Sequence, residues 1–245
     1  HIGGMTIHSW SGIGIKTKLN KYDLDKIAAN KRIVKHVHRA KTLIIDEMSM
    51  LSPATLDMVD AVCREINRNS EPFGGIQIVL VGDFFQLPPI VKREEDETQV
   101  ALIEEAPVRF AYDASAWKRA NLTVCYLTEQ YRQDDGNFLA LLSAIRNNTF
   151  GNDHLSQIET RKINFHSAPA GAPKLFSHNA DVDRVNDGVL AKLSGKPQVF
   201  SMFSQGPSVM VSALKRGCLS PETLYLKVGA AVMFTKNNQK GIFVN

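Results

Sequence analysis

Two adjacent carboxylates, Asp46 and Glu47, directly follow a short apolar segment that ends at Ile45. An apolar run of this length predicts a strand that is buried on both faces of a parallel sheet. The acids would then emerge at the carboxyl end of the strand, where open α/β sheets bind ligands. A carboxylate in such a place can hold Mg²⁺, and its neighbour can polarise an attacking water. Two acids that simply face solvent are the alternative interpretation.

A second apolar segment, residues 76–81, is followed by Gly82 and then by Gln86. A helical pattern separates the two segments, so together they predict a βαβ unit. Because parallel strands end at the same edge of a sheet, Gln86 is expected beside Asp46 and Glu47, within reach of a γ-phosphate. Gly82 would let the backbone turn tightly at that edge.

Other patterns predict the elements around this unit. Residues 23–38 favour one basic helix, and residues 122–128 a third strand that ends in polar residues. Residues 174–186 favour a strand followed by a helix capped by Asn179. Ser52 and Pro53 suit the start of a helix between the first two strands. The apolar residues of that helix recur at helical spacing and predict its buried face: Leu56, Val59, Val62, Cys63 and Ile66.

Four segments resemble, in order and spacing, consecutive motifs of the Pif-type DNA helicases, superfamily 1 relatives of the RecD-type helicases. They are residues 3–9 (GGMTIHS), 46–50 (DEMSM), 82–89 (GDFFQLPP) and 127–133 (LTEQYRQ). The resemblance covers most of the chain, and DEMSM followed about 35 residues later by GDFFQLPP is its most specific part. It implies an ATP-driven motor that moves 5′→3′ on single-stranded DNA and unwinds duplexes. DNA repair, recombination or telomere maintenance would be its setting.

The resemblance also implies the fold class and the domains. We expect an α/β fold with a RecA-like P-loop NTPase core, in which helices flank a parallel sheet. The core would be incomplete. Residues 1–128 would form the first RecA-like motor domain, and residues 129–245 part of a second. The start of a small, SH3-like β-barrel insertion is expected near residues 222–245.

The same resemblance assigns roles at the nucleotide site. Asp46 would hold Mg²⁺ and Glu47 would activate the attacking water, with ATP as the substrate. Gln86 would sense the γ-phosphate. Arg132, from the second domain, would neutralise charge that develops on the transferred phosphate, as such arginines do. A salt bridge to a nearby acid is the alternative role for Arg132.

Single-stranded DNA contacts are implied at two places. Thr6, His8 and Ser9 could donate hydrogen bonds to phosphates in the first domain, and Trp10 beside them could stack on a base or pack in the core. In the second domain, His178 and Asn179 are candidate phosphate contacts at the start of a helix. Helix capping by Asn179 explains the same residue equally well.

The phosphate loop that such a motor needs is not found in these 245 residues. The segment from Gly12 to Thr17 approaches the pattern G-x-x-x-x-G-K-[ST], but Ile15 separates Gly14 from the lysine. In the family this loop would precede His1. We therefore expect the 245-residue chain alone to be inactive. A non-catalytic single-stranded DNA-binding remnant is the alternative function, and a recombination or conjugation factor with a helicase-like core is a third.

Charge is distributed unevenly along the chain. Net charge is only +4, but residues 1–41 hold nine lysines and arginines against two aspartates, or +7, which leaves −3 for the remainder. Clustered cations near a phosphate-processing site predict a track for a nucleic-acid backbone. A solvated helix face is the alternative.

Cysteine usage and hydropathy bear on location. Three widely separated cysteines show no metal-ligand spacing and favour a reducing compartment. Apolar runs are strand-sized, so we expect no membrane association. We expect a monomer that acts on single-stranded DNA and duplex junctions inside the cell. Its compartment would be the nucleus or mitochondrion in a eukaryote, and the cytoplasm in a bacterium or during viral infection.

Overall fold

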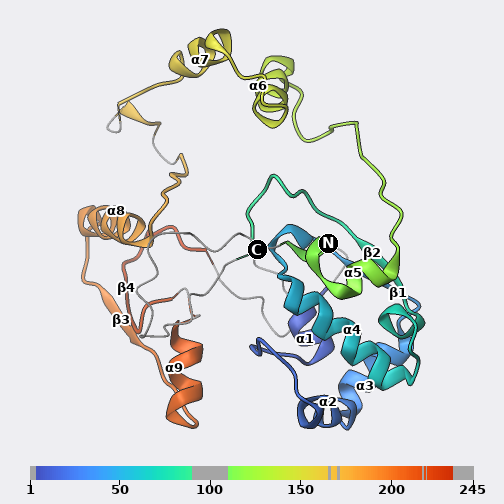
Figure 1. Cartoon of the computed structure of the whole chain (residues 1–245). Coiled ribbons are helices and arrows are strands. Elements are labelled where there is room, and N and C mark those ends of the chain that lie inside the picture. The colour runs from blue at the N-terminus through green and yellow to red at the C-terminus, as the bar shows by residue number, and fades with distance from the viewer. Residues whose placement is uncertain are drawn as a thin grey trace, which may run out of the picture. The chain divides into compact units, whose positions relative to one another are not determined.

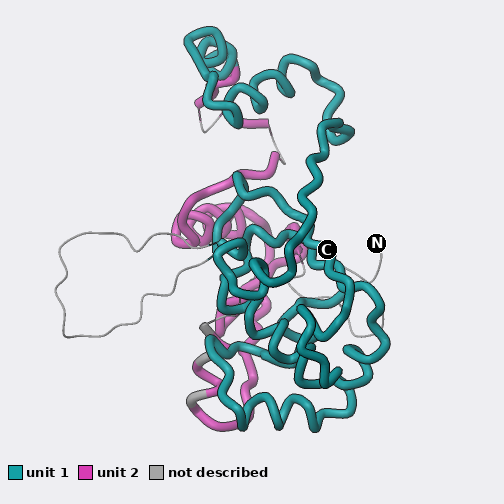
Figure 2. The backbone as a smooth tube through the Cα atoms, turned by 45° about the vertical axis from the view of Figure 1, so that its right-hand side comes forward, with its two compact units in different colours: residues 1–160 teal, residues 161–245 magenta. Residues whose placement is uncertain are grey.

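The computed structural model describes residues 4–89, 110–164, 167–169, 172–216, 218 and 220–233 (Figure 1). The chain divides into two compact units, residues 1–160 and residues 161–245, each of which is described by itself (Figure 2). The elements of the first unit are α1 (Ile7–Ser11), α2 (Lys21–Ala28), α3 (Lys31–Arg39), β1 (Thr42–Ile45), η1 (Met48–Met50), α4 (Pro53–Asn67), η2 (Pro72–Gly75), β2 (Gln77–Leu80), η3 (Ala111–Asp113), α5 (Ser115–Ala120), α6 (Gly136–Arg146) and α7 (Asn152–Glu159). Those of the second are α8 (Asn179–Lys192), β3 (Gln198–Ser201), α9 (Ser208–Arg216) and β4 (Thr223–Leu226).

The two apolar segments form the parallel pair that their sequences predict. β1 pairs with β2 in a register that sets Thr42 opposite Gln77 and Ile45 opposite Leu80. Burial alternates along β1, because Ile45 faces the core while Ile44 is 61% exposed. The expectation of burial on both faces is therefore wrong for the described residues, since Ile44 of β1 and Val79 of β2 are both exposed.

Helix α4 connects the strands and supplies the centre of the core. Ser52 is its N-cap, with the hydroxyl accepting a hydrogen bond from the Thr55 N–H at 3.2 Å, and Pro53 is the first helical residue. This start confirms the prediction. The five residues of the expected buried face are all buried: Leu56, Val59, Val62, Cys63 and Ile66. α4 contacts α1, α2, α3 and α5, so it is the element on which these four helices assemble.

One carboxylate, Asp60 of α4, is fully buried and joins three elements. Its Oδ1 accepts the Phe73 N–H of η2 at 2.8 Å. Its Oδ2 accepts a hydrogen bond from Arg119 of α5 at 2.5 Å. The Nε of Arg64 lies 3.0 Å from the same oxygen as an ion pair, without the geometry of a hydrogen bond. Buried charges need such partners, so this network fixes how η2 and α5 dock on α4.

The single basic helix expected over residues 23–38 is two helices, α2 and α3. The break has a local cause, since the Asn30 side chain accepts hydrogen bonds from the N–H groups of Arg32 and Ile33 and so begins a new helix. An asparagine side chain competes with the backbone in this way inside a helical pattern.

The strand expected over residues 122–128 is not formed. This segment is extended and largely exposed, with Leu127 at 93%. A strand requires a hydrogen-bonded neighbour, and β1 and β2 pair only with each other in the described chain. Residues 174–178 likewise form no strand. The helix after them begins at Asn179 with His178 as its N-cap, so capping by the Asn179 side chain is also wrong.

In the second unit β3 and β4 pair antiparallel, with Gln198 opposite Leu226. Lys227 donates to the Leu193 carbonyl at the end of α8 at 2.8 Å, which ties that helix to the residue that follows β4. The expected barrel insertion extends through residues 234–245, which lie outside the described residues, so it stays a prediction. The motor-domain boundary after residue 128 also stays a prediction. Among the described helices, none combines the length and apolar character needed to cross a bilayer.

Candidate nucleotide site

The turns that follow β1 and β2 are bound to each other. Val81 N–H donates to the Ile45 carbonyl at 2.8 Å, and Met48 N–H donates to the Val81 carbonyl at 3.0 Å. Gly82 then approaches the first turn so closely that a Cβ would stand 2.7 Å from Met48 Cγ and 3.0 Å from Met48 N. A side chain at this position would force Met48 to shift, because real Cβ atoms essentially never approach closer than 3.0 Å. The two turns are therefore closely packed against each other at one edge.

The acidic turn projects its side chains outward from this edge. Asp46 Oδ1 accepts the Glu47 N–H at 2.9 Å, which leaves the second oxygen free of hydrogen bonds to the described chain. Glu47 has a left-handed backbone, with φ 51° and ψ 41°, which costs a non-glycine residue about 1 kcal/mol. Both side chains are exposed. Strain of this kind persists where packing enforces it and is frequent at functional sites.

Asp83 organises the second turn. Its backbone carbonyl accepts the Gln86 N–H at 2.9 Å and its carboxylate accepts the Phe85 N–H at 3.1 Å. Arg146 of α6 binds the same carboxylate through both terminal nitrogens, at 2.6 and 3.0 Å, and lies 4.8 Å above the Phe85 ring. The Arg146 hydrogen bonds hold the pKa of Asp83 below its ordinary value. Arg146 was not predicted from the sequence, in which a cation in the last turn of a helix was its only signal.

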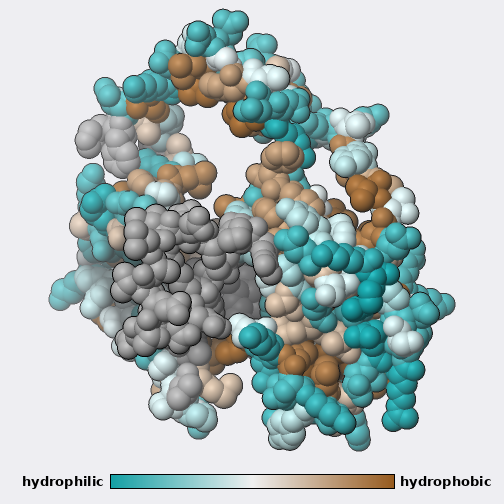
Figure 3. All heavy atoms as spheres, in the orientation of Figure 1, coloured by the Kyte–Doolittle hydropathy of each residue, from teal (hydrophilic) through white to brown (hydrophobic). Residues whose placement is uncertain are grey.

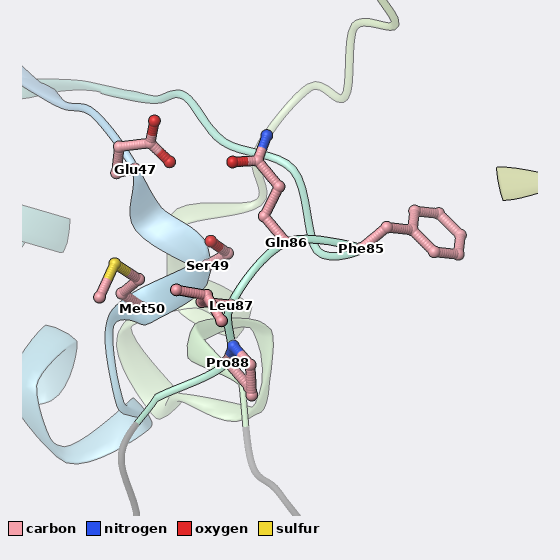
Figure 4. A pocket seen from close by; sticks show the side chains of 7 residues that line it. All are labelled: Glu47, Ser49, Met50, Phe85, Gln86, Leu87 and Pro88. Atoms are coloured by element: carbon pink, nitrogen blue, oxygen red, sulfur yellow. The ribbon is translucent and has the colours of Figure 1, made fainter. Parts of the chain in front are cut away.

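A cavity of about 560 Å³ lies between the turns, lined by Glu47, Ser49, Met50, Phe85, Gln86, Leu87 and Pro88. Glu47 and the amide of Gln86 form its polar end, whereas Leu87 and Pro88 lie at the opposite end (Figure 4). The Ser49 hydroxyl is buried and has no hydrogen-bond partner among the described residues. An orphaned hydroxyl beside a carboxylate and an amide suits a polar ligand in this cavity.

The structure brings Glu47 and Gln86 to one cavity, whose lining does not include Asp46. Asp46 and Glu47 are adjacent, and Gln86 shares the cavity with Glu47. Arg132 is not with them: it is exposed in the extended segment before α6 and does not line the cavity. It makes no ion pair within the described ranges, so its alternative role as a salt bridge is not seen either.

The expected DNA contacts lie in two separate places. Thr6 caps α1, and its hydroxyl donates to the Ser9 hydroxyl at 3.1 Å, while the His8 side chain is exposed on the same helix. In the second unit His178 and Asn179 are exposed at the start of α8, where His178 Nδ1 lies 2.9 Å from a serine hydroxyl. All five are accessible to a ligand.

The donor set at the edge fits Mg²⁺. No group of three or more His, Cys, Asp or Glu side chains able to hold an ion occurs in the part of the chain that the structure describes. Mg²⁺ needs only one or two carboxylates from a protein when substrate phosphates and water complete its shell. The exposed carboxylates of Asp46 and Glu47 meet that requirement.

Known proteins resemble this chain over nearly its whole length. Residues 1–164 match the family described as PIF1-like helicase. The "ATP-dependent DNA helicase Pif1" of Psychrobacter sp. (strain PRwf-1) is 36% identical over 98% of the chain. The chain spans only 36% of that relative.

Two solved structures show the same fold. The crystal structure of the Pif1 helicase from Candida albicans matches 99% of the chain with TM-score 0.79 at 31% identity, over 53% of that protein. That of the Bacteroides Pif1 helicase in complex with ADP-AlF3 and ssDNA matches 99%, with TM-score 0.73 at 29% identity, over 55% of its chain. These likenesses, with the parallel pair and its flanking helices, confirm the expected α/β, RecA-like fold.

Proposed function

Because the chain belongs to the PIF1-like helicase family, we propose that it acts as an ATP-dependent DNA helicase that couples ATP hydrolysis to DNA unwinding. The observation that carries the proposal is the shared cavity of Glu47 and Gln86, held between two turns that Gly82 locks together. A solved relative, the Bacteroides enzyme, is described with ADP-AlF3 and ssDNA, which are a nucleotide and a DNA ligand. We assign the same two ligand classes to this chain.

The polar residues at and near the cavity each have a chemical task in this proposal. Bound Mg²⁺ supplies positive charge to the phosphates, and Asp46 is the residue that would hold it. Glu47 accepts a hydrogen bond from the attacking water and orients it. The Gln86 amide and the unpartnered Ser49 hydroxyl provide hydrogen bonds to the phosphate end of the nucleotide. Arg132 places its positive charge beside the γ-phosphate once the second motor domain closes, and so neutralises the negative charge that develops there.

DNA contacts complete the motor. Thr6, His8 and Ser9 would hold single-stranded DNA on the first unit, and His178 and Asn179 on the second, as donors to phosphate oxygens. We further propose translocation 5′→3′, action at duplex junctions as a monomer, and roles in DNA repair, recombination or telomere maintenance. These roles place the protein with DNA inside the cell, in a compartment that depends on the organism.

ATPase turnover with and without single-stranded DNA tests the nucleotide site. We would measure it in the 245-residue chain and in a version that includes the flanking sequence of its gene. Glu47→Gln should lower turnover about 10²- to 10⁴-fold, the usual contribution of a general base, while DNA binding persists. The matched control is Glu65→Gln, an exposed glutamate of α4 outside the cavity, which should leave turnover unchanged.

The outcomes separate the proposal from its alternative. In a version that hydrolyses ATP, equal turnover of Glu47→Gln and of the unaltered protein would refute the role of that carboxylate. DNA binding without any ATPase activity, in the long version as well as the short one, would favour the non-catalytic remnant instead.

A further inference from the structure

Arg146, the last residue of α6, holds the turn that carries Gln86, although it lies 63 residues beyond Asp83 in the sequence. Its two terminal nitrogens donate to separate oxygens of Asp83, and its guanidinium also lies against the Phe85 ring. A planar guanidinium that matches both oxygens of a carboxylate fixes the orientation of that carboxylate as well as its position. Arg146 therefore holds the Asp83 carboxylate in one orientation.

The Asp83 carboxylate in turn binds the side chain of Gln86. Gln86 Nε2 donates to Asp83 Oδ2 at 3.5 Å, the same oxygen that accepts from Nη1 of Arg146. An ionised carboxylate can only accept hydrogen bonds, so the amide nitrogen must face Asp83 and the amide oxygen must face away from it. Figure 4 shows this arrangement, with the amide oxygen of Gln86 on the side of Glu47 and the nitrogen turned away.

Orientation is the main consequence of this contact. The Arg146 side chain is 51% exposed, and ion pairs of exposed side chains contribute little to stability. The Gln86 amide, by contrast, lines the cavity between the two turns. A side chain that meets reacting groups needs support from its neighbours, because a small misplacement lowers the rate steeply.

We infer that Arg146 is a positioning residue for ATP hydrolysis, which acts through Asp83 to hold the Gln86 amide in one orientation. In that orientation the amide oxygen can accept a hydrogen bond from the water that Glu47 orients, and the second N–H stays available to the phosphates. Without Arg146 the carboxylate can rotate and the amide can reverse. The effect on turnover rests on the proposed function, whereas the hold on Gln86 does not.

The first measurement needs no nucleotide. In the isotope-labelled 245-residue chain, the side-chain NH₂ signals of Gln86 are identified by their loss in Gln86→Ala, and their heteronuclear NOE reports the rigidity of the amide. Arg146→Gln should lower this NOE and shift both signals toward those of a free glutamine. The matched control is Arg184→Gln, which removes the same charge from an exposed arginine–aspartate pair on α8 and should change neither. Circular dichroism would confirm that the variants are folded.

The second measurement is ATPase kinetics in the version that includes the flanking sequence. Arg146→Gln should lower kcat about 10- to 100-fold, the effect of misplacing a reacting group, and leave KM essentially unchanged. Arg146→Lys keeps the charge but lacks the planar fork, so it should lose nearly as much. Arg184→Gln should keep the turnover of the unaltered protein.

A double variant shows whether Arg146 acts through Gln86. Gln86→Ala alone should lower kcat about 10²- to 10³-fold, as the loss of a hydrogen-bonding group at a reacting centre does. Adding Arg146→Gln should then lower it no further, because the side chain that Arg146 positions is already absent. A role that is merely structural would multiply the two losses.

Unchanged Gln86 signals in Arg146→Gln would overturn the inference, as would multiplied losses in the double variant or full turnover in Arg146→Lys. If Glu47→Gln lowers turnover and Arg146→Gln does not, the proposed function stands and only the inference fails. If the unaltered long version hydrolyses no ATP, the proposed function fails. In that case the Gln86 signals alone decide whether Arg146 positions this side chain.

Discussion

Replacing Asp60 by alanine tests the buried network that docks η2 and α5 on α4. The substitution removes the acceptor of the buried Phe73 N–H, which costs about 1–3 kcal/mol. The side chains of Arg64 and Arg119 are 37% and 44% exposed, so water replaces much of what they lose, and each adds at most about 1 kcal/mol. The sum is a loss of about 3 kcal/mol in the free energy of unfolding, at the low end for breaking a buried ion pair.

Urea unfolding followed by far-UV circular dichroism measures this loss, with the emission of Trp117 on α5 as a local probe in a Trp10→Phe background. For a unit of this size about 3 kcal/mol corresponds to a fall in Tm of about 6–12 °C. Asp60→Asn keeps an acceptor for Phe73 and should lose about half as much. A loss below about 1 kcal/mol in Asp60→Ala would refute this account of the docking, and equal losses in the two variants would assign the effect to charge alone.

Three further changes test the site and the core. Gly82→Ala should destabilise the chain by about 1–3 kcal/mol and lower nucleotide affinity, measured by urea unfolding and calorimetry, because its Cβ would collide with the acidic turn. Arg146→Gln should raise the pKa of Asp83 toward its ordinary 3.8, as a carboxyl NMR titration would show. In the unaltered chain the ion pair between Arg146 and Asp83 stabilises the fold at pH values above 3.8, and this stabilisation is lost as the pH falls through the lowered pKa of Asp83. Burial raises the pKa of the Cys63 thiol to about 12, so Cys63 should resist alkylation in the native chain while the two exposed cysteines react, as mass spectrometry would show. The neutral thiol favours the folded state up to the pKa of the unfolded chain, near 9. This contribution to stability is lost as the pH rises toward 12.

Local patterns were sufficient to predict the centre of the candidate nucleotide site. The apolar segments that become β1 and β2, the start of α4 at Ser52 and its buried face are all set by residues close in sequence. Polar residues after parallel strands must meet at one edge, so Glu47 and Gln86 could be placed together before any coordinates. Residues 122–128 have the same kind of pattern as β1, yet they form no strand, because pairing depends on a distant partner that the pattern does not contain.

Side-chain pairs between distant elements could not be predicted in this way. Arg146 and Asp83 are 63 residues apart, and nothing near either residue specifies the other. The helix break at Asn30 was predictable in kind, since asparagine favours caps, but the apolar periodicity across it favoured one helix. Hydrophobic patterning also misleads where apolar side chains stay exposed, as Phe138 and Ile158 do on α6 and α7, a region where Figure 3 shows hydrophobic residues at the surface.

The contact at Gly82 limits how this protein can change over evolutionary time. A smaller side chain at position 48 would remove the nearest obstacle to a Cβ, but the backbone nitrogens of Met48 and Ser49 would remain 3.0 and 3.3 Å away. Contacts of that length require the backbone of the acidic turn to give by a few tenths of an ångström. A change at position 48 alone therefore does not make full room for a side chain at position 82, and such a chain would also have to adjust the turn that carries the two acids.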